Sequence, residues 1–259
     1  PENDWTTDLM VDEKHTSIAL FNSREPIIFC GADIIKFAFS DSMEVETISD
    51  GTKVNSGDKI ASVSGPTKEI LIKERVILNL IQRLSGIATT THQYVKALDN
   101  KNIKILDTRK TTPGLRDLEK FAVYIGGGSS HRKNLSTGIL IKDNHLSITS
   151  IEKTIIKIKQ TKQVVPIQIE VDFIDQITSK LVQVVDGFLL DNMNPTQMRE
   201  CIVKINNLNT SNRKMFIEAS GGVTLDKIAD YNIEGLHGVS IGALTHHIRS
   251  VDIGLDHVG

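Results

Sequence analysis

The sequence is poor in aromatic residues, in cysteine and in long apolar runs, and each shortage excludes a class of protein. Aromatic residues make up 5% of the 259 positions, so the core must be built from aliphatic side chains. No stretch approaches the roughly 20 consecutive apolar residues that a membrane-spanning helix needs. Cys30 and Cys201 lie far apart and outside any C-x-x-C pattern. This excludes a disulfide framework and a cysteine zinc site, and the expected compartment is the reducing cytoplasm.

Charge is also close to balanced, except in one segment. The formal net charge is -2 and the isoelectric point is near 6.5, which argues against general nucleic-acid binding. Between Lys104 and Lys142, however, eight Lys and Arg residues face three Asp and Glu residues, and His131 lies among them. This local excess of positive charge predicts a small anionic ligand.

The first third of the chain predicts short strands followed by one long helix. Asp50-Gly51 and Ser56-Gly57 are hairpin turn sequences and separate two expected strands in residues 44–66. A lipoyl-carrier hairpin is disfavoured because Lys59 lies within a turn and not at a hairpin apex. Residues 67–98 carry apolar side chains at helical spacing, with Gly86 as a candidate break; these side chains are Ile70, Ile77, Leu78, Ile81, Leu84 and Ala88.

From residue 102 onward, short apolar strands alternate with amphipathic helices. Six strands are expected, at 102–107, 138–142, 166–171, 187–191, 214–219 and 238–242. Helices are expected near 115–125, 148–162, 174–183, 195–206 and 224–231, with a final helical segment after the last strand. This alternation predicts a parallel sheet closed into a full or partial barrel. A doubly wound sheet is the second choice, and no G-x-G-x-x-G follows the first strand to support its dinucleotide-binding form.

Polar and glycine residues follow all six expected strands, at the edge where barrel enzymes carry their active sites. One group is cationic: Arg109, Lys110, His131, Arg132 and Lys142. Arginine suits carboxylates and lysine suits phosphates, so both types together predict a carboxylate next to a phosphate. Glu170 and Asp191 are placed to hold Mg²⁺ or sugar hydroxyls, or else to be structural partners of the lysines. The sequences EASGG and SIGALTHH, after the last two strands, are candidate phosphate loops.

Several ordered motifs resemble the quinolinate phosphoribosyltransferase family, also called carboxylating nicotinate-nucleotide pyrophosphorylases. They run from about residue 70 to the end of the chain and include ILDTRKTTPGLRDLEKFAV, ILIKDNH, IEVD, LLDNM, SGGV and GALTH. The resemblance implies an α/β fold with an N-terminal α/β sandwich domain at residues 1–98 and an incomplete α/β (TIM-like) barrel at 99–243. Residues 244–259 are then expected to pack back on the N-terminal domain.

The resemblance also implies an activity and roles for single residues. Phosphoribosyl pyrophosphate and quinolinate would yield nicotinate mononucleotide, pyrophosphate and CO₂ with Mg²⁺, in a homodimer or higher oligomer that shares its active sites. Quinolinate would be bound by Arg75 of a neighbouring subunit together with Arg109, His131, Arg132 and Lys142. Lys110, Lys142, Glu170 and Asp191 would be the catalytic group, with Glu170 and Asp191 also near Mg²⁺. Ser220, Gly221, Gly242 and His246 would bind the 5′-phosphate.

The sequence departs from the family pattern at two places. Ser130 replaces the usual Asn before His131-Arg132, and Lys133-Asn134 replace the usual residues after them, which changes loop shape more than charge. The opening is reduced to ENDWTT, so an N-terminal helix is expected to be missing or trimmed.

Other functions remain open at this point. One is a Schiff-base lyase or aldolase that uses Lys142 or Lys110. Another is a non-catalytic anion-binding relative. A third is another phosphoribosyltransferase, for which nicotinate is a possible substrate.

Overall fold

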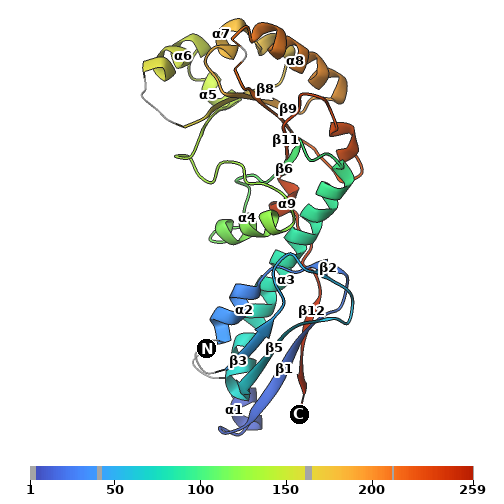
Figure 1. Cartoon of the computed structure of the whole chain (residues 1–259). Coiled ribbons are helices and arrows are strands. Elements are labelled where there is room, and N and C mark those ends of the chain that lie inside the picture. Colours follow the sequence, from blue (N-terminus) through green and yellow to red (C-terminus); the bar gives the residue numbers. More distant parts are fainter. Residues whose placement is uncertain (1–3, 40–42, 161–164, 212, 259) are drawn as a thin grey trace. The chain divides into compact units, whose positions relative to one another are not determined.

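The computed structural model describes residues 4–39, 43–160, 165–211 and 213–258 (Figure 1). It divides the chain into two compact units. Unit 1 comprises residues 1–92, 113–127 and 244–259, and unit 2 comprises residues 93–112 and 128–243. None of the helices in the described ranges combines the length and the apolar composition required to cross a bilayer.

Unit 1 is built on a four-stranded antiparallel sheet in the order β12-β1-β5-β3. Its strands are β1 (Thr16–Ser23), β3 (Glu44–Thr47), β5 (Lys59–Pro66) and β12 (Ile253–Val258). A second, two-stranded sheet pairs β2 (Ile27–Ile28) with β4 (Lys53–Val54). The helices are α1 (Trp5–Met10), α2 (Ala32–Phe39), α3 (Thr67–Leu98, whose last residues belong to unit 2) and α4 (Arg116–Ile125).

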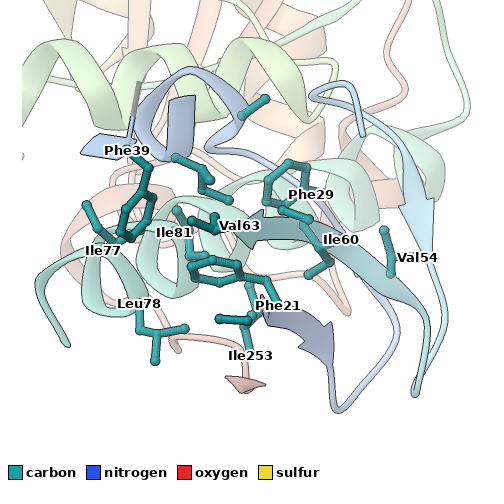
Figure 2. Packing of buried hydrophobic residues seen from close by; sticks show 14 of the residues in the cluster. Phe21, Phe29, Phe39, Val54, Ile60, Val63, Ile77, Leu78, Ile81 and Ile253 are labelled. Atoms are coloured by element: carbon teal, nitrogen blue, oxygen red, sulfur yellow. The ribbon is translucent and has the colours of Figure 1, made fainter. Parts of the chain in front are cut away.

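The expected long helix is confirmed and supplies one wall of the unit 1 core. All six apolar residues that define its pattern are buried. Figure 2 shows Ile77, Leu78 and Ile81 of α3 packed with side chains of the sheet, among them Phe21, Val63 and Ile253. This aliphatic packing with few aromatic rings is the kind of core that the composition predicts.

Gly86 does not interrupt α3, and the structure explains why it is a glycine. A Cβ atom at this position would lie 2.3 Å from the carbonyl oxygen of Arg249. The C-terminal segment crosses the helix here, where Val251 N–H donates to the Gln82 carbonyl and the Gln82 side chain donates to the Ile253 carbonyl. Glycine is therefore required for close approach of the chain and does not end the helix.

The structure differs from the sequence prediction in the grouping of α4 and in the strands before α3. Residues 113–127 group with unit 1, whereas the sequence places them in the barrel. Within unit 1, Arg83 of α3 donates two hydrogen bonds to the buried carboxylate of Glu119 on α4, at 2.9 and 2.7 Å. Residues 44–66 form three strands, not two, because Lys53–Val54 pairs separately with β2.

Unit 2 is a six-stranded, all-parallel sheet, as the alternating pattern predicts. Its order is β6-β11-β10-β9-β8-β7. The strands are β6 (Lys104–Leu106), β7 (Ile139–Ile141), β8 (Ile167–Val171), β9 (Gly187–Asp191), β10 (Phe216–Ser220) and β11 (Gly238–Ser240). The connecting helices are α5 (Asp143–Leu146), α6 (Ile151–Gln160), α7 (Ser179–Val182) and α8 (Pro195–Leu208), followed by α9 (Ala243–His246). In this α/β sheet, β6 and β7 are the two edge strands, which confirms the incomplete barrel.

Two of the expected helices are shorter than the sequence predicts. The segment 174–183 divides into a 3₁₀ turn (η1, Ile174–Gln176) and α7, because Ile177 adopts an extended conformation. The segment 224–231 contains one 3₁₀ turn (η2, Ile228–Tyr231), in which Ile228 and Tyr231 are buried. These two residues are three positions apart, which matches the repeat of three residues per turn in a 3₁₀ helix.

Candidate functional site

The register of the parallel sheet places the polar side chains of several strands on one face. Gln168, Gly187 and Phe216 are neighbours in one row across β8, β9 and β10. The next row contains Glu170, Leu189, Glu218, Gly238 and Lys104. Because side chains alternate along a strand, residues in register point to the same side, and so do residues two positions further along. Gln168, Glu170, Asp191, Glu218 and Ser220 therefore share this face, which we call the inward face.

The inward face borders a cavity of about 620 Å³ within unit 2, a size typical of small-molecule sites. Much of its wall is apolar, with Leu106, Leu140 and Phe216 among the lining residues. Polar groups come from Gln168 and Glu218 on the sheet. Cationic groups come from the loop between α4 and β7, which contributes His131 and Arg132 to the lining. An apolar pocket with a few convergent charges suits a small planar anion.

His131 is held by groups from three strands. Its backbone N–H donates to Asp107 Oδ1 at 2.9 Å, just after β6. Its Nε2 lies 3.3 Å from Gln168 Oε1 and 3.3 Å from Glu218 Oε2. Burial alone would lower the pKa of His131. The hydrogen bond and charge of Glu218, with help from Gln168, outweigh burial and raise the pKa above its usual value.

Arg132 lies next in the chain and also faces the cavity. Its guanidinium donates to the Gly138 carbonyl at 3.0 Å, and its backbone N–H donates to Nδ1 of His131 at 2.8 Å. Burial and the nearby charge of Arg109 lower the pKa of Arg132. The electrostatic effect of Arg109 on Arg132 means that the structure brings these two predicted carboxylate binders near each other. Arg109 and Lys110 are themselves exposed, in the loop after β6.

Lys142 and Glu170 form a second cluster, at the carboxyl ends of β7 and β8. The Lys142 ammonium donates a hydrogen bond to Glu170 Oε2. Glu170 is buried, whereas the Lys142 side chain is 43% exposed. Asp191, at the end of β9, is half-buried and accepts a hydrogen bond from the Asn192 side chain at 2.7 Å. Ser220 is its neighbour in register on β10.

The predicted site residues in unit 2 lie at two levels along the strands, one beside the cavity and one at the strand ends. His131 and Arg132 line the cavity, whose other walls come largely from the beginnings of strands. Lys142, Glu170, Asp191, Ser220, Gly221 and Gly242 lie at or beyond the strand ends and are not part of its lining. Arg75, exposed on α3, and His246, at the end of α9, belong to unit 1.

One glycine of the candidate phosphate loops has a structural reason as well. Gly221 has a φ of +92°, and a Cβ atom there would lie 2.1 Å from the Asn192 side chain. This position needs glycine with or without a ligand, so its phosphate-binding role stays a prediction.

Only a few side chains of this site are available to bind a metal ion. Within the residues that the structure describes, no group of three or more His, Cys, Asp or Glu side chains could hold a metal ion. Mg²⁺ usually keeps several waters and is bound through one or two carboxylates together with substrate phosphates. Glu170 and Asp191, on the same face, fit that limited contribution.

Gln168 and Glu218 are the site residues that sequence reasoning missed. The sequence places Glu218 near a strand end but indicates no role for it. One signal is available: a carboxylate lies within an apolar strand, two residues before Ser220, and an ionisable side chain buried there must have a partner. The identity of the partner requires the sheet order.

Comparisons with known proteins identify the family of both halves of the chain. Residues 4–85 match the family described as quinolinate phosphoribosyl transferase, N-terminal domain, and residues 87–256 match its C-terminal domain. A relative from Bacillus subtilis, named probable nicotinate-nucleotide pyrophosphorylase [carboxylating], is 44% identical over 235 residues, which cover 88% of this chain and 79% of the relative. A Mycobacterium leprae relative, named nicotinate-nucleotide pyrophosphorylase [carboxylating], is 35% identical over 240 residues, covering 90% and 84%.

Solved structures show the same fold. The nicotinate-nucleotide pyrophosphorylase of Ehrlichia chaffeensis superposes with a TM-score of 0.91 at 35% identity, covering 99% of this chain and 93% of that one. NadC of Streptococcus pyogenes gives a TM-score of 0.89 at 32% identity, with coverage of 99% and 92%. With both domains matched in order along nearly the whole sequence, the chain belongs to the quinolinate phosphoribosyltransferase family.

Proposed function

We propose that this protein transfers the phosphoribosyl group of phosphoribosyl pyrophosphate to the ring nitrogen of quinolinate. The products are nicotinate mononucleotide, pyrophosphate and CO₂, a step of NAD biosynthesis. The observation that carries the proposal is the cavity on the inward face, where His131 and Arg132 provide cationic groups against an apolar wall. Family membership supports the same activity.

The chain's own residues supply binding and charge stabilisation. Arg132, with Arg109 nearby, is placed to bind carboxylates through the fork of the guanidinium. Lys142 and Lys110 are proposed to stabilise the negative charge that develops on the departing pyrophosphate. The displacement at the anomeric carbon passes through an oxocarbenium-like state, as in glycoside cleavage. No covalent nucleophile is required, since positioning and electrostatics account for most of the rate enhancement.

Loss of CO₂ follows from the same pocket. Once the ring nitrogen carries the ribose, its positive charge stabilises the electron pair that the broken C–C bond leaves on the adjacent carbon. This carbon then takes a proton from water, which gives nicotinate mononucleotide. The apolar part of the wall favours this step, because water would otherwise stabilise the carboxylate that must be lost.

Mg²⁺, a homo-oligomer and the cytoplasm are further parts of the proposal. Glu170 and Asp191 would contact Mg²⁺ that arrives with the pyrophosphate, and the metal would neutralise charge on the leaving group. Ser220, Gly221, Gly242 and His246 are proposed to hold the 5′-phosphate, and Arg75 to serve the active site of a second copy. Both cysteines are buried free thiols, which suits a reducing compartment.

The deciding experiment measures pyrophosphate and CO₂ release from phosphoribosyl pyrophosphate and Mg²⁺ with either quinolinate or nicotinate. We expect both products with quinolinate and little turnover with nicotinate, because several cationic groups exceed the need of one carboxylate. Turnover with nicotinate alone would contradict the proposal. A lyase that uses Lys142 as an amine would instead be trapped by borohydride with a carbonyl substrate, and we expect no trapping.

A further inference from the structure

Glu218 is a buried acid in a pocket proposed to bind an acid. Its side chain is fully buried on β10 and lines the cavity. Its Oε2 accepts a hydrogen bond from the Gln168 amide at 2.8 Å and lies 3.3 Å from His131 Nε2. Its Oε1 has no hydrogen-bond partner among the residues in the described ranges. A buried carboxylate near a dicarboxylate ligand is unfavourable by itself, so its presence calls for a reason.

The contacts of His131 supply that reason. Because the Arg132 N–H points to Nδ1, the neutral ring must carry its proton on Nε2, and the cationic ring carries a proton there as well. In both forms the Nε2–H is directed to Glu218 and Gln168. On the other side of the ring, Nδ1 accepts the backbone N–H of Arg132. The ring therefore links the sheet to the backbone of the residue that follows it.

A second buried carboxylate holds the beginning of the segment 130–132. Asp107 is fully buried, and its two oxygens accept hydrogen bonds from the Ser130 hydroxyl at 3.0 Å and the His131 backbone N–H at 2.9 Å. The segment 130–132 is thus fixed at one end by Asp107 and at the other by Glu218, acting through the His131 ring. Arg132, its last residue, lines the cavity.

We infer that Glu218 is a positioning residue for the proposed reaction. Through the His131 ring it fixes the segment 130–132, and this segment places Arg132 where it can bind the carboxylates of the acceptor substrate. The inference rests on the proposed function. It assigns Glu218 to the acceptor side of the site alone, since its contacts lead to Arg132 and not to the Lys142–Glu170 pair. Gln168 assists by bonding to both Glu218 and His131.

The test compares Glu218→Leu, which removes the acceptor, with Glu218→Gln, which keeps an oxygen for His131 Nε2–H. For Glu218→Leu we expect the KM for quinolinate to rise about 10- to 100-fold, with the KM for phosphoribosyl pyrophosphate unchanged. Glu218→Gln should restore the quinolinate KM to within about threefold of wild type. A purely structural role for Glu218 would not produce this separation of the two KM values.

Glu119→Gln is the matched control. Glu119 is as fully buried as Glu218, but it lies on α4 in unit 1, is not part of the cavity lining, and accepts two hydrogen bonds from Arg83 at 2.9 and 2.7 Å. We expect this variant to lower Tm and to leave the quinolinate KM unchanged. If Glu218→Leu does not fold, Gln168→Leu takes its place and should raise the quinolinate KM several-fold.

Two outcomes overturn the inference. One is a folded Glu218→Leu or Gln168→Leu variant with the quinolinate KM of wild type. The other is a parallel rise in the KM for both substrates. Failure of wild type itself to consume quinolinate is a different result and contradicts the proposed function.

Discussion

Two levels of the inward face carry charged groups, and they differ in how those groups are solvated. At the strand ends, Lys142 is 43% exposed and pairs with Glu170. Nearer the beginnings of the strands, Glu218 is fully buried, accepts a hydrogen bond from Gln168 and lies 3.3 Å from His131 Nε2. Because the lysine of the Lys142–Glu170 pair is nearly half exposed, its ammonium can turn to a ligand at a smaller cost than a fully buried group. A buried network is costly to rearrange, so it suits the fixing of geometry.

The largest expected effect comes from removing the exchangeable partner. Lys142→Ala should lower kcat by about 10²- to 10³-fold, because this ammonium is proposed to stabilise the leaving pyrophosphate in the transition state. Tm should fall only moderately: the lysine is nearly half exposed, but its removal leaves the buried Glu170 carboxylate without this partner. Steady-state kinetics and thermal unfolding check both parts. Lys180→Ala, an exposed lysine on α7, is the control and should change neither quantity.

A different result would mean that the charged groups at both levels are structural. If Lys142→Ala lowered Tm strongly and kept kcat, then Lys142–Glu170 would be a structural pair, the alternative that the sequence leaves open.

Much of the fold was predictable because its signals are local. Helix α3 follows from the spacing of apolar residues such as Ile77, Leu78 and Ile81, which the core buries. The six parallel strands follow from short apolar runs that alternate with helical patterns. Gly86 was misleading as a candidate break, because the reason for it is the carbonyl of Arg249 in a distant part of the sequence. No local pattern reports such an approach.

The candidate site was predictable in composition but not in arrangement. Residues at strand ends can be found from the sequence, and Lys142, Glu170 and Asp191 are found in this way. The network of Gln168, Glu218 and His131 depends on which strands are neighbours and on register, and these are properties of the whole sheet. The division of the site into two levels was hidden for the same reason.

A smaller effect, confined to one substrate, is expected for Arg132→Ala. Loss of a charge-assisted hydrogen bond costs about 1.5–3 kcal/mol, so kcat/KM for quinolinate should fall about 10- to 100-fold. Arg132→Lys should recover part of this loss, because it restores the charge but not the fork. Unchanged steady-state kinetics in Arg132→Ala would remove this arginine from the site.

Arg213→Ala is the matched control for that comparison. Arg213 donates hydrogen bonds to the carbonyls of Gln183 and Val185 and pairs with Asp186, so it joins chain segments instead of lining the cavity. Its removal should lower Tm and leave kcat/KM for quinolinate near the wild-type value.

The smallest expected effect is the pH dependence of stability at His131. The raised pKa means that protonation of the ring stabilises the folded state: burial and the charge of Arg132 oppose it, but the hydrogen bond and then the charge of Glu218 outweigh them. The backbone N–H of Arg132, which points to Nδ1, favours the neutral ring. The full negative charge of Glu218 near Nε2 outweighs this single neutral N–H dipole. This contribution is fully present below the unfolded-state pKa of about 6.5 and is lost as pH rises through the higher folded-state value. Urea unfolding of wild type and His131→Asn between about pH 5.5 and 8.5 should therefore show the largest difference in the free energy of unfolding at the acidic end. A difference that grows toward alkaline pH would mean that His131 is held neutral, and that Glu218 acts on it only as a hydrogen-bond acceptor.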